Sequence, residues 1–193
     1  MFGGRFLVWT ANEVIPLERK MVATLRDVPA RIVPAGTPIT IPEGSFITIT
    51  QSLGGNYTVT VNGNMARIDG TDTDALGFEK QELVFTGNDG EDIQEAQVWQ
   101  ALETIFDPEI PVNVVSLGLI YSVVVDQQNK TVDIKMTLTA PGCGMGPVLV
   151  GDIEYRVAKV PNVKTVNVDL VFDPAWHRDM MSDEAKLETG MFY

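Results

Sequence analysis

One stretch decides the fold of this chain: Thr139-Ala140-Pro141-Gly142-Cys143-Gly144-Met145-Gly146-Pro147. Before it, residues 132–138 alternate apolar and polar side chains, which is the period of a half-buried strand. After it, apolar side chains recur every four positions at Leu149, Ile153 and Val157. Pro147 suits the first position of a helix, because its missing N–H needs no partner there. The stretch is therefore predicted to link a strand to a helix over residues 147–160.

Cys143 is the only cysteine in the chain and lies at the centre of this predicted loop. The N-terminus of a helix favours a thiolate, because its unpaired N–H groups and its dipole are positive. Gly142 and Gly144 leave room for a metal, a ligand or another backbone to come close. A lone cysteine is also a common small buried side chain without chemistry. Cys143 is a candidate reactive residue, and the structural alternative stays open.

The composition excludes several kinds of partner and site. The chain has 193 residues, of which 45% are hydrophobic and 21% charged, as in ordinary globular proteins. A formal net charge of −12 argues against nucleic acid and anionic membranes as partners, because both need a basic face. One cysteine excludes an internal disulfide and a site built from several thiolates of one chain. No apolar run reaches membrane-spanning length, so we expect a cytoplasmic protein.

The N-terminal half predicts a small all-β domain. Residues 1–20 have weak periodicity and are interpreted as an N-terminal arm. Residues 21–70 contain short runs of β-branched side chains between turn signals, and Asn62-Gly63 is typical of a two-residue hairpin of type I′. Such spacing favours a small barrel or sandwich. Residues 71–91 are rich in Asp, Glu, Gly and Asn and are predicted to form an acidic linker.

The C-terminal half predicts a different architecture over residues 92–175. An amphipathic helix carries Val98, Leu102 and Ile105 on one face and ends before Pro108. Two alternating strands, the loop of Cys143 with its helix, and a third strand follow, in the order α-β-β-α-β. The fold class is therefore α+β, a two-layer helix/sheet C-terminal domain preceded by a small all-β N-terminal domain.

Residues 176–193 are interpreted as a C-terminal tail. Trp176, Met180 and Met181 suit either packing or a soft surface for partner proteins. His177, the only histidine, is interpreted as a solvated loop residue, because one imidazole without partners makes no metal site.

Several ordered motifs resemble the PaaD-like family of iron–sulfur assembly factors. They are Asp107-Pro108-Glu109-Ile110-Pro111-Val112-Asn113, Leu117-Gly118-Leu119-Ile120-Tyr121, and Thr137-Leu138-Thr139 followed by Cys143. Others are similar to the SufT branch of that family, namely Gly142-Cys143-Gly144-Met145-Gly146, Asp173-Pro174-x-Trp176, and the stretches 51–59 and 66–70. The resemblance covers most of the chain beyond the first twenty residues.

The resemblance implies a cytoplasmic auxiliary factor that helps to mature iron–sulfur proteins and is not a turnover enzyme. It makes Cys143 the reactive position, places Asp107 and Glu109 near it, and puts Thr139 on the same loop. Many relatives have proline where this chain has Gly144. The family pattern leaves the position of His177 free, so the resemblance gives that residue no ligand role.

Three mechanisms follow. In the first, a labile iron–sulfur cluster or iron is bound through Cys143 and shared, because a cluster normally takes four ligands. The sharing partner is a second protomer or an apo-client. Asp107 and Glu109 would shape the pocket or supply an oxygen ligand. Alternatively the protein is an adaptor that recruits other assembly proteins, with Cys143 structural or redox-sensing. An enzyme with Cys143 as nucleophile and His177 as base lacks an orienting third group.

Overall fold

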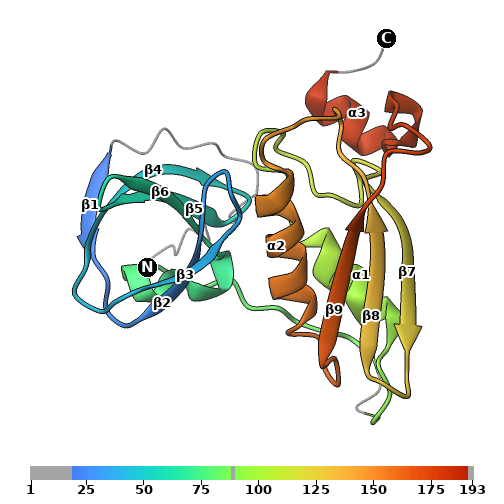
Figure 1. The fold of residues 1–193 in the computed structure, drawn as a ribbon, viewed down its shortest axis with the longest axis horizontal. Coiled ribbons are helices and arrows are strands. Elements are labelled where there is room, and N and C mark those ends of the chain that lie inside the picture. Colours follow the sequence, from blue (N-terminus) through green and yellow to red (C-terminus); the bar gives the residue numbers. More distant parts are fainter. Residues whose placement is uncertain (1–18, 88–89, 191–193) are drawn as a thin grey trace, which may run out of the picture.

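The computed structural model describes residues 19–87 and 90–190, and within these ranges it contains two units that pack side by side (Figure 1). The N-terminal unit is a curled six-stranded antiparallel sheet in the order β1-β4-β5-β6-β2-β3. Its strands are β1 (Lys20–Ala23), β2 (Val28–Ile32), β3 (Pro38–Ile41), β4 (Phe46–Leu53), β5 (Asn56–Val61) and β6 (Asn64–Ile68). The inward side chains, such as Ile47, Ile49 and Val59, form a separate hydrophobic core.

The hairpin between β5 and β6 has the predicted geometry. Asn62 and Gly63 are its two turn residues, and both have positive φ, 49° and 80°. A type I′ turn requires positive φ at both positions, which Asn and Gly adopt at little cost.

The N-terminal sheet is closed at one end by the 3-10 helix η1 (Gly70–Leu76). Ala75 and Leu76 of this helix lie in the core of the sheet, and Phe78 stacks on Tyr57 with ring centroids 5.2 Å apart. These contacts group residues 71–78 with the N-terminal unit, although the sequence analysis assigns them to the acidic linker of residues 71–91. The division of the chain into domains stays a prediction.

The C-terminal unit confirms the predicted α+β class and the order α-β-β-α-β. Its elements are α1 (Glu95–Glu103), β7 (Ile120–Asp126), β8 (Thr131–Met136), α2 (Gly146–Val157) and β9 (Thr165–Leu170). Strand β8 lies in the middle of the sheet, antiparallel to β7 and parallel to β9. Both helices cover one face of this sheet, and α2 lies between the sheet and the N-terminal unit (Figure 1).

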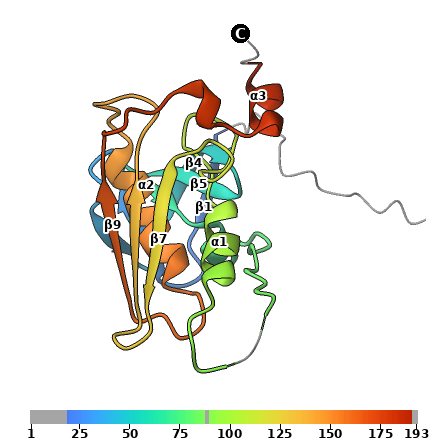
Figure 2. The same cartoon turned by 90° about the vertical axis from the view of Figure 1, so that its right-hand side faces the viewer.

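The chain after β9 folds back over the end of the C-terminal unit, where the 3-10 helix η2 (Arg178–Met180) and helix α3 (Asp183–Thr189) lie (Figure 2). The Ser182 hydroxyl caps α3 by accepting a hydrogen bond of 3.1 Å from the Ala185 N–H. Within the predicted C-terminal tail, η2 and α3 thus form short helices, and Met181 and Ala185 are buried.

Of the predicted N-terminal arm, residues 1–18 lie outside the described residues, and Lys20 already belongs to β1. Within the part of the chain that the structure describes, no helix has the length and apolar character needed to cross a membrane.

Candidate functional site

The loop of Cys143 joins β8 to α2, as the sequence predicts. The Cys143 N–H donates to the Ala140 carbonyl at 3.2 Å, and the Gly146 N–H donates to the Cys143 carbonyl at the same distance. Cys143 is half-buried and packs against the hydrophobic core of the C-terminal unit. The cysteine therefore lies three residues before the first residue of α2, in a tight turn that fixes its backbone.

The glycines beside Cys143 differ from the glycine that begins α2. A Cβ atom added to Gly142 or Gly144 would meet no atom within 4 Å, so both sides of the cysteine are open. A Cβ on Gly146 would lie 2.9 Å from the Leu138 side chain, so this residue holds the helix against the strand end. The loop is anchored at one end and leaves open space beside the backbone on either side of the half-buried cysteine.

Asp107 shapes its own loop. Its side chain is 8% exposed, and Oδ1 accepts hydrogen bonds from the N–H groups of Glu109 (2.8 Å) and Ile110 (2.9 Å). This turn, typical of Asp, helps to fold the motif back on itself, so that Phe106 pairs with Asn113. Glu109 itself is exposed. Among the described residues, no hydrogen bond or ion pair joins either carboxylate to Cys143, so their predicted proximity to the thiol stays a prediction.

Two threonines lie between β8 and the cysteine. Thr139 is half-buried on the loop. Thr137, which was not a candidate, is completely buried, and its hydroxyl has no hydrogen-bond partner among the residues described. Its N–H donates to the Leu119 carbonyl at 2.8 Å, which fastens the end of β8 to the adjacent segment.

Trp176, Met180 and Met181, the candidate partner surface, are partly buried within the C-terminal unit. Trp176 is half-buried, and its Nε1–H donates to the Leu117 carbonyl at 2.8 Å. Met181 is 4% exposed and belongs to the hydrophobic core, so a surface role does not fit it. Met180 is half-buried, and its Sδ lies 3.8 Å from the Tyr121 hydroxyl.

His177 is exposed, and its Nδ1 lies 3.6 Å from a carboxylate oxygen of Asp179. Over residues 19–87 and 90–190 the structure shows no group of three or more His, Cys, Asp or Glu side chains that could hold a metal ion.

Comparison with known proteins identifies the C-terminal unit. A family model described as iron-sulfur cluster assembly protein matches residues 95–170. An Fe-S protein maturation auxiliary factor of Porphyromonas gingivalis is 48% identical over 96 residues, which make up 50% of this chain and 90% of that protein. The chain belongs to the iron–sulfur cluster assembly family. The auxiliary factors YitW of Bacillus subtilis and SufT of Staphylococcus aureus are 40% and 41% identical over 52% and 45% of this chain, and each is covered over 98% of its length.

These matches confirm the family predicted from the motifs and, with it, a role in iron–sulfur cluster assembly and maturation. They cover about half of this chain, and the family model lies entirely in the C-terminal unit. The resemblance seen in stretches 51–59 and 66–70 stays a prediction. Residues 95–170 are called the family domain below.

The N-terminal unit touches the family domain close to the Cys143 loop. Gly36, in the turn between β2 and β3, has a φ of +71°, and a Cβ added to it would lie 2.5 Å from the Pro147 carbonyl oxygen. Gly54 lies between β4 and β5, and a Cβ atom added to it would clash with the Phe106 side chain. Glycine is required at Gly36 both by its backbone conformation and by the approach of α2.

A buried polar cluster connects the two units, and sequence reasoning missed it. This interdomain network comprises Asn56, Arg67, Asp69, Gln81, Thr104, Asp152 and Arg156. At its centre, Arg156 is completely buried. Its Nε donates to Asp69 Oδ2 at 2.8 Å, and its Nη2 donates to Asn56 Oδ1 at 2.8 Å and to Gln81 Oε1 at 3.0 Å.

The last Arg156 donor, Nη1, bonds the Thr104 carbonyl at the end of α1. Burial alone would raise the pKa of the Asp69 carboxyl. The charge and hydrogen bond of Arg156, together with the N–H and hydroxyl of Thr71, outweigh burial and lower this pKa below its ordinary value. Asp69 is therefore a carboxylate at neutral pH, and Arg156 fixes α1, α2 and the N-terminal unit to one another.

A second ion pair in the network joins Arg67 of β6 to Asp152 of α2, with Nε 2.8 Å from Oδ2. Burial raises the pKa of the Asp152 carboxyl, although the positive charge of Arg67 opposes this shift. The sequence signal for the network was weak, because Asp152 and Arg156 lie four residues apart on a helix, a spacing typical of exposed ion pairs.

Proposed function

We propose that the chain receives iron or a labile iron–sulfur cluster at Cys143 and passes this cargo to client proteins, without catalysing a turnover reaction. The observation that carries the proposal is the position of the only thiol in the sequence, between two open glycines at the start of α2. Thiolates are the usual ligands of iron–sulfur clusters. An accessible thiol suits a cargo that must be released.

The ligand count requires a second contributor. A cluster normally takes four protein ligands, whereas the described residues offer one thiol and no pre-arranged group of three ligand side chains. Cys143 would therefore share the cargo with a second protomer or with an apo-client. Glu109, as the exposed carboxylate of its motif, suits a supplementary oxygen ligand better than Asp107, whose Oδ1 already accepts two N–H groups.

The partners that follow from this role are other iron–sulfur assembly proteins and apo-clients, met in the cytoplasm. The maturation factors that the chain resembles support these partners. Trp176 is held by the Leu117 carbonyl with part of its ring exposed, and with Met180 it offers a contact surface near the end of the family domain.

The test is anaerobic reconstitution with iron and sulfide, followed by iron and sulfide analysis, visible absorbance and mass by light scattering. Cys143→Ser removes the thiol, and Ala140→Ser is the matched control, since it adds a hydroxyl to an exposed position of the same loop and keeps the cysteine. We expect absorbance from a cluster in the wild type and in Ala140→Ser, in a species with two protomers, and its loss in Cys143→Ser.

A different result would overturn the proposal. If neither the wild type nor the control retains iron, alone or with a client, while client maturation still improves, the protein is an adaptor. If Cys143→Ser retains as much iron as the wild type, the thiol is not the ligand.

A further inference from the structure

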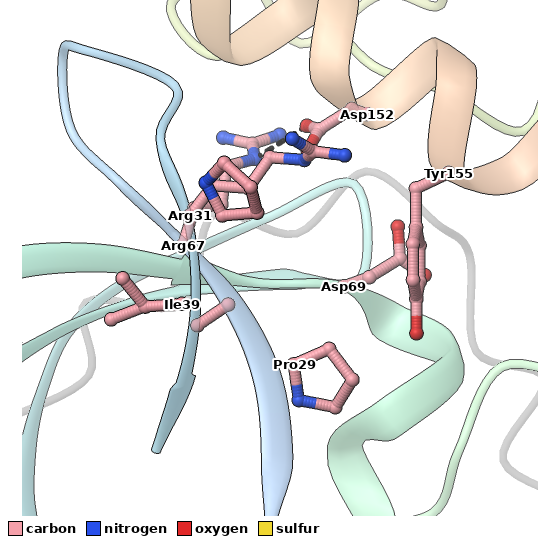
Figure 3. A pocket seen from close by; sticks show the side chains of 9 residues that line it. Pro29, Arg31, Ile39, Arg67, Asp69, Asp152 and Tyr155 are labelled. Carbon is pink, nitrogen blue, oxygen red and sulfur yellow. Dashed lines mark ion pairs between the residues drawn. The ribbon is translucent and has the colours of Figure 1, made fainter.

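A pocket opens between the N-terminal unit and helix α2, apart from the loop of Cys143 (Figure 3). It has a volume of about 90 Å³. One side consists of apolar side chains of β2 and β3, among them Pro29 and Ile39, and the other side carries Arg31, Arg67 and the ring of Tyr155. An apolar wall opposite a few converging polar groups is typical of small-molecule sites.

The charges around the pocket leave one positive charge uncompensated. Its two carboxylates are already paired, Asp69 with Arg156 and Asp152 with Arg67, each at 2.8 Å. Arg31 donates from Nη1 to the Gly36 carbonyl at 3.3 Å, and no carboxylate among the described residues lies within 4.0 Å of its guanidinium nitrogens. The lining itself has two arginines and two aspartates, and Arg156 behind Asp69 brings the count to three guanidinium groups for two carboxylates. In a chain of net charge −12, this local surplus of one positive charge favours a ligand with one negative charge.

Arg67 adds hydrogen-bonding capacity that the protein does not use. It is 4% exposed, and neither Nε nor Nη2 has a hydrogen-bond partner among the residues described, although Nε lies 2.8 Å from Asp152 Oδ2. The N–H group of Nε is thus poorly aligned with that oxygen. Buried donors without an acceptor are uncommon in folded proteins. Both nitrogens are shielded from solvent, so Arg67 adds positive charge beside the pocket and leaves direct contact with a ligand to Arg31.

We propose that this pocket binds a small organic monocarboxylate with a short hydrocarbon chain. The carboxylate meets the guanidinium of Arg31, because a guanidinium offers paired N–H groups that match the two oxygens. The hydrocarbon part lies against Pro29 and Ile39. A dianion such as phosphate fits less well, since the second negative charge would face Asp69 and Asp152. The site goes beyond cargo transfer at Cys143.

Binding is measured by titrating the full-length protein at constant ionic strength and recording backbone amide shifts in NMR spectra. The probes are acetate, butyrate, the neutral butyramide, and inorganic phosphate. We expect saturable shifts with butyrate at Ala30, Ile39 and Asp152, with a Kd on the order of 1 mM. Each buried methylene strengthens binding about fourfold, so butyrate is expected to bind roughly 15-fold more tightly than acetate.

The charge requirement is tested with Arg31→Gln, and Arg178→Gln is the matched control because Arg178 is exposed on η2. Butyrate binding is expected to weaken at least tenfold in Arg31→Gln and to be unchanged in the control. Arg31→Lys keeps the charge without the paired donors and is expected to bind with intermediate affinity, which separates loss of charge from loss of fold. Equal affinity for butyrate and phosphate would overturn the carboxylate class, and unchanged binding by Arg31→Gln, or no saturable shift in the wild type, would overturn the site.

Discussion

The interdomain network and the loop of Cys143 are built in opposite ways. In the network, every nitrogen of Arg156 has a partner, and these partners come from both units. At the same interface, Cβ atoms added to Gly36 and Gly151 would each lie 2.5 Å from atoms already present. Beside Cys143, Cβ atoms added to Gly142 and Gly144 would meet no atom within 4 Å. The chain thus fixes the family domain rigidly to the N-terminal unit and leaves the loop on either side of Cys143 uncrowded.

The largest expected effect on stability comes from breaking the network at its centre. Arg156→Met leaves the 7%-exposed Asp69 carboxylate without its cation, and removing one partner of a buried ion pair costs about 3–5 kcal/mol. Chemical unfolding measures this loss. Adding Asp69→Asn is expected to recover part of it, because the two changes share one interaction. If Arg156→Met unfolds at the same denaturant concentration as the wild type, the network does not hold the units together.

Comparing alanine substitutions at two glycines separates the effect of the close contact with α2 from the effect of backbone strain. Gly36 and Gly142 both have positive φ, +71° and +88°, so Ala is strained at either position. Only at Gly36 does the new methyl group also press on the Pro147 carbonyl. We expect Gly36→Ala to lower the free energy of unfolding by about 1–3 kcal/mol more than Gly142→Ala does. Equal losses in the two variants would mean that the contact with α2 yields easily.

Asp107 tests whether its motif is a turn or a ligand. Asp107→Ala removes the acceptor of two N–H groups and is expected to cost about 1–2 kcal/mol in chemical unfolding. Asp107→Asn keeps an oxygen acceptor, so it should cost less. Iron retention after reconstitution separates the roles: a turn residue keeps iron as Asn, whereas an oxygen ligand does not.

The smallest effect on stability is expected at the thiol itself. Cys143→Ser changes one half-buried atom in an open loop, so the free energy of unfolding should stay within about 0.5 kcal/mol of the wild type. The same variant is expected to lose its cargo. A large loss of stability would instead indicate that Cys143 is a packing residue, which is the structural alternative raised by its contact with the core.

Sequence patterns predicted those features of the fold that depend on residues close together in the sequence. The alternation of residues 132–138 gave strand β8, and Asn62-Gly63 gave the hairpin, because both follow from local backbone preferences. The interdomain network was not predictable, since Asp69 and Arg156 are 87 positions apart and nothing in their local sequence indicates that they meet. The sequence leaves Met181 open between packing and a surface role for a similar reason, because its burial depends on how residues 174–182 fold back over the domain.

The contact between Gly36 and Pro147 also determines what a docking protein meets. The tip of the β2–β3 turn, with Pro34 and Ala35 exposed, rests on the first turn of the helix that follows Cys143. The distance from this tip to the thiol is therefore set by the fold and not by a hinge. A protein that bound the tip would find the Cys143 thiol at a constant distance from its own binding site. The N-terminal unit would then set the position of a partner protein relative to Cys143.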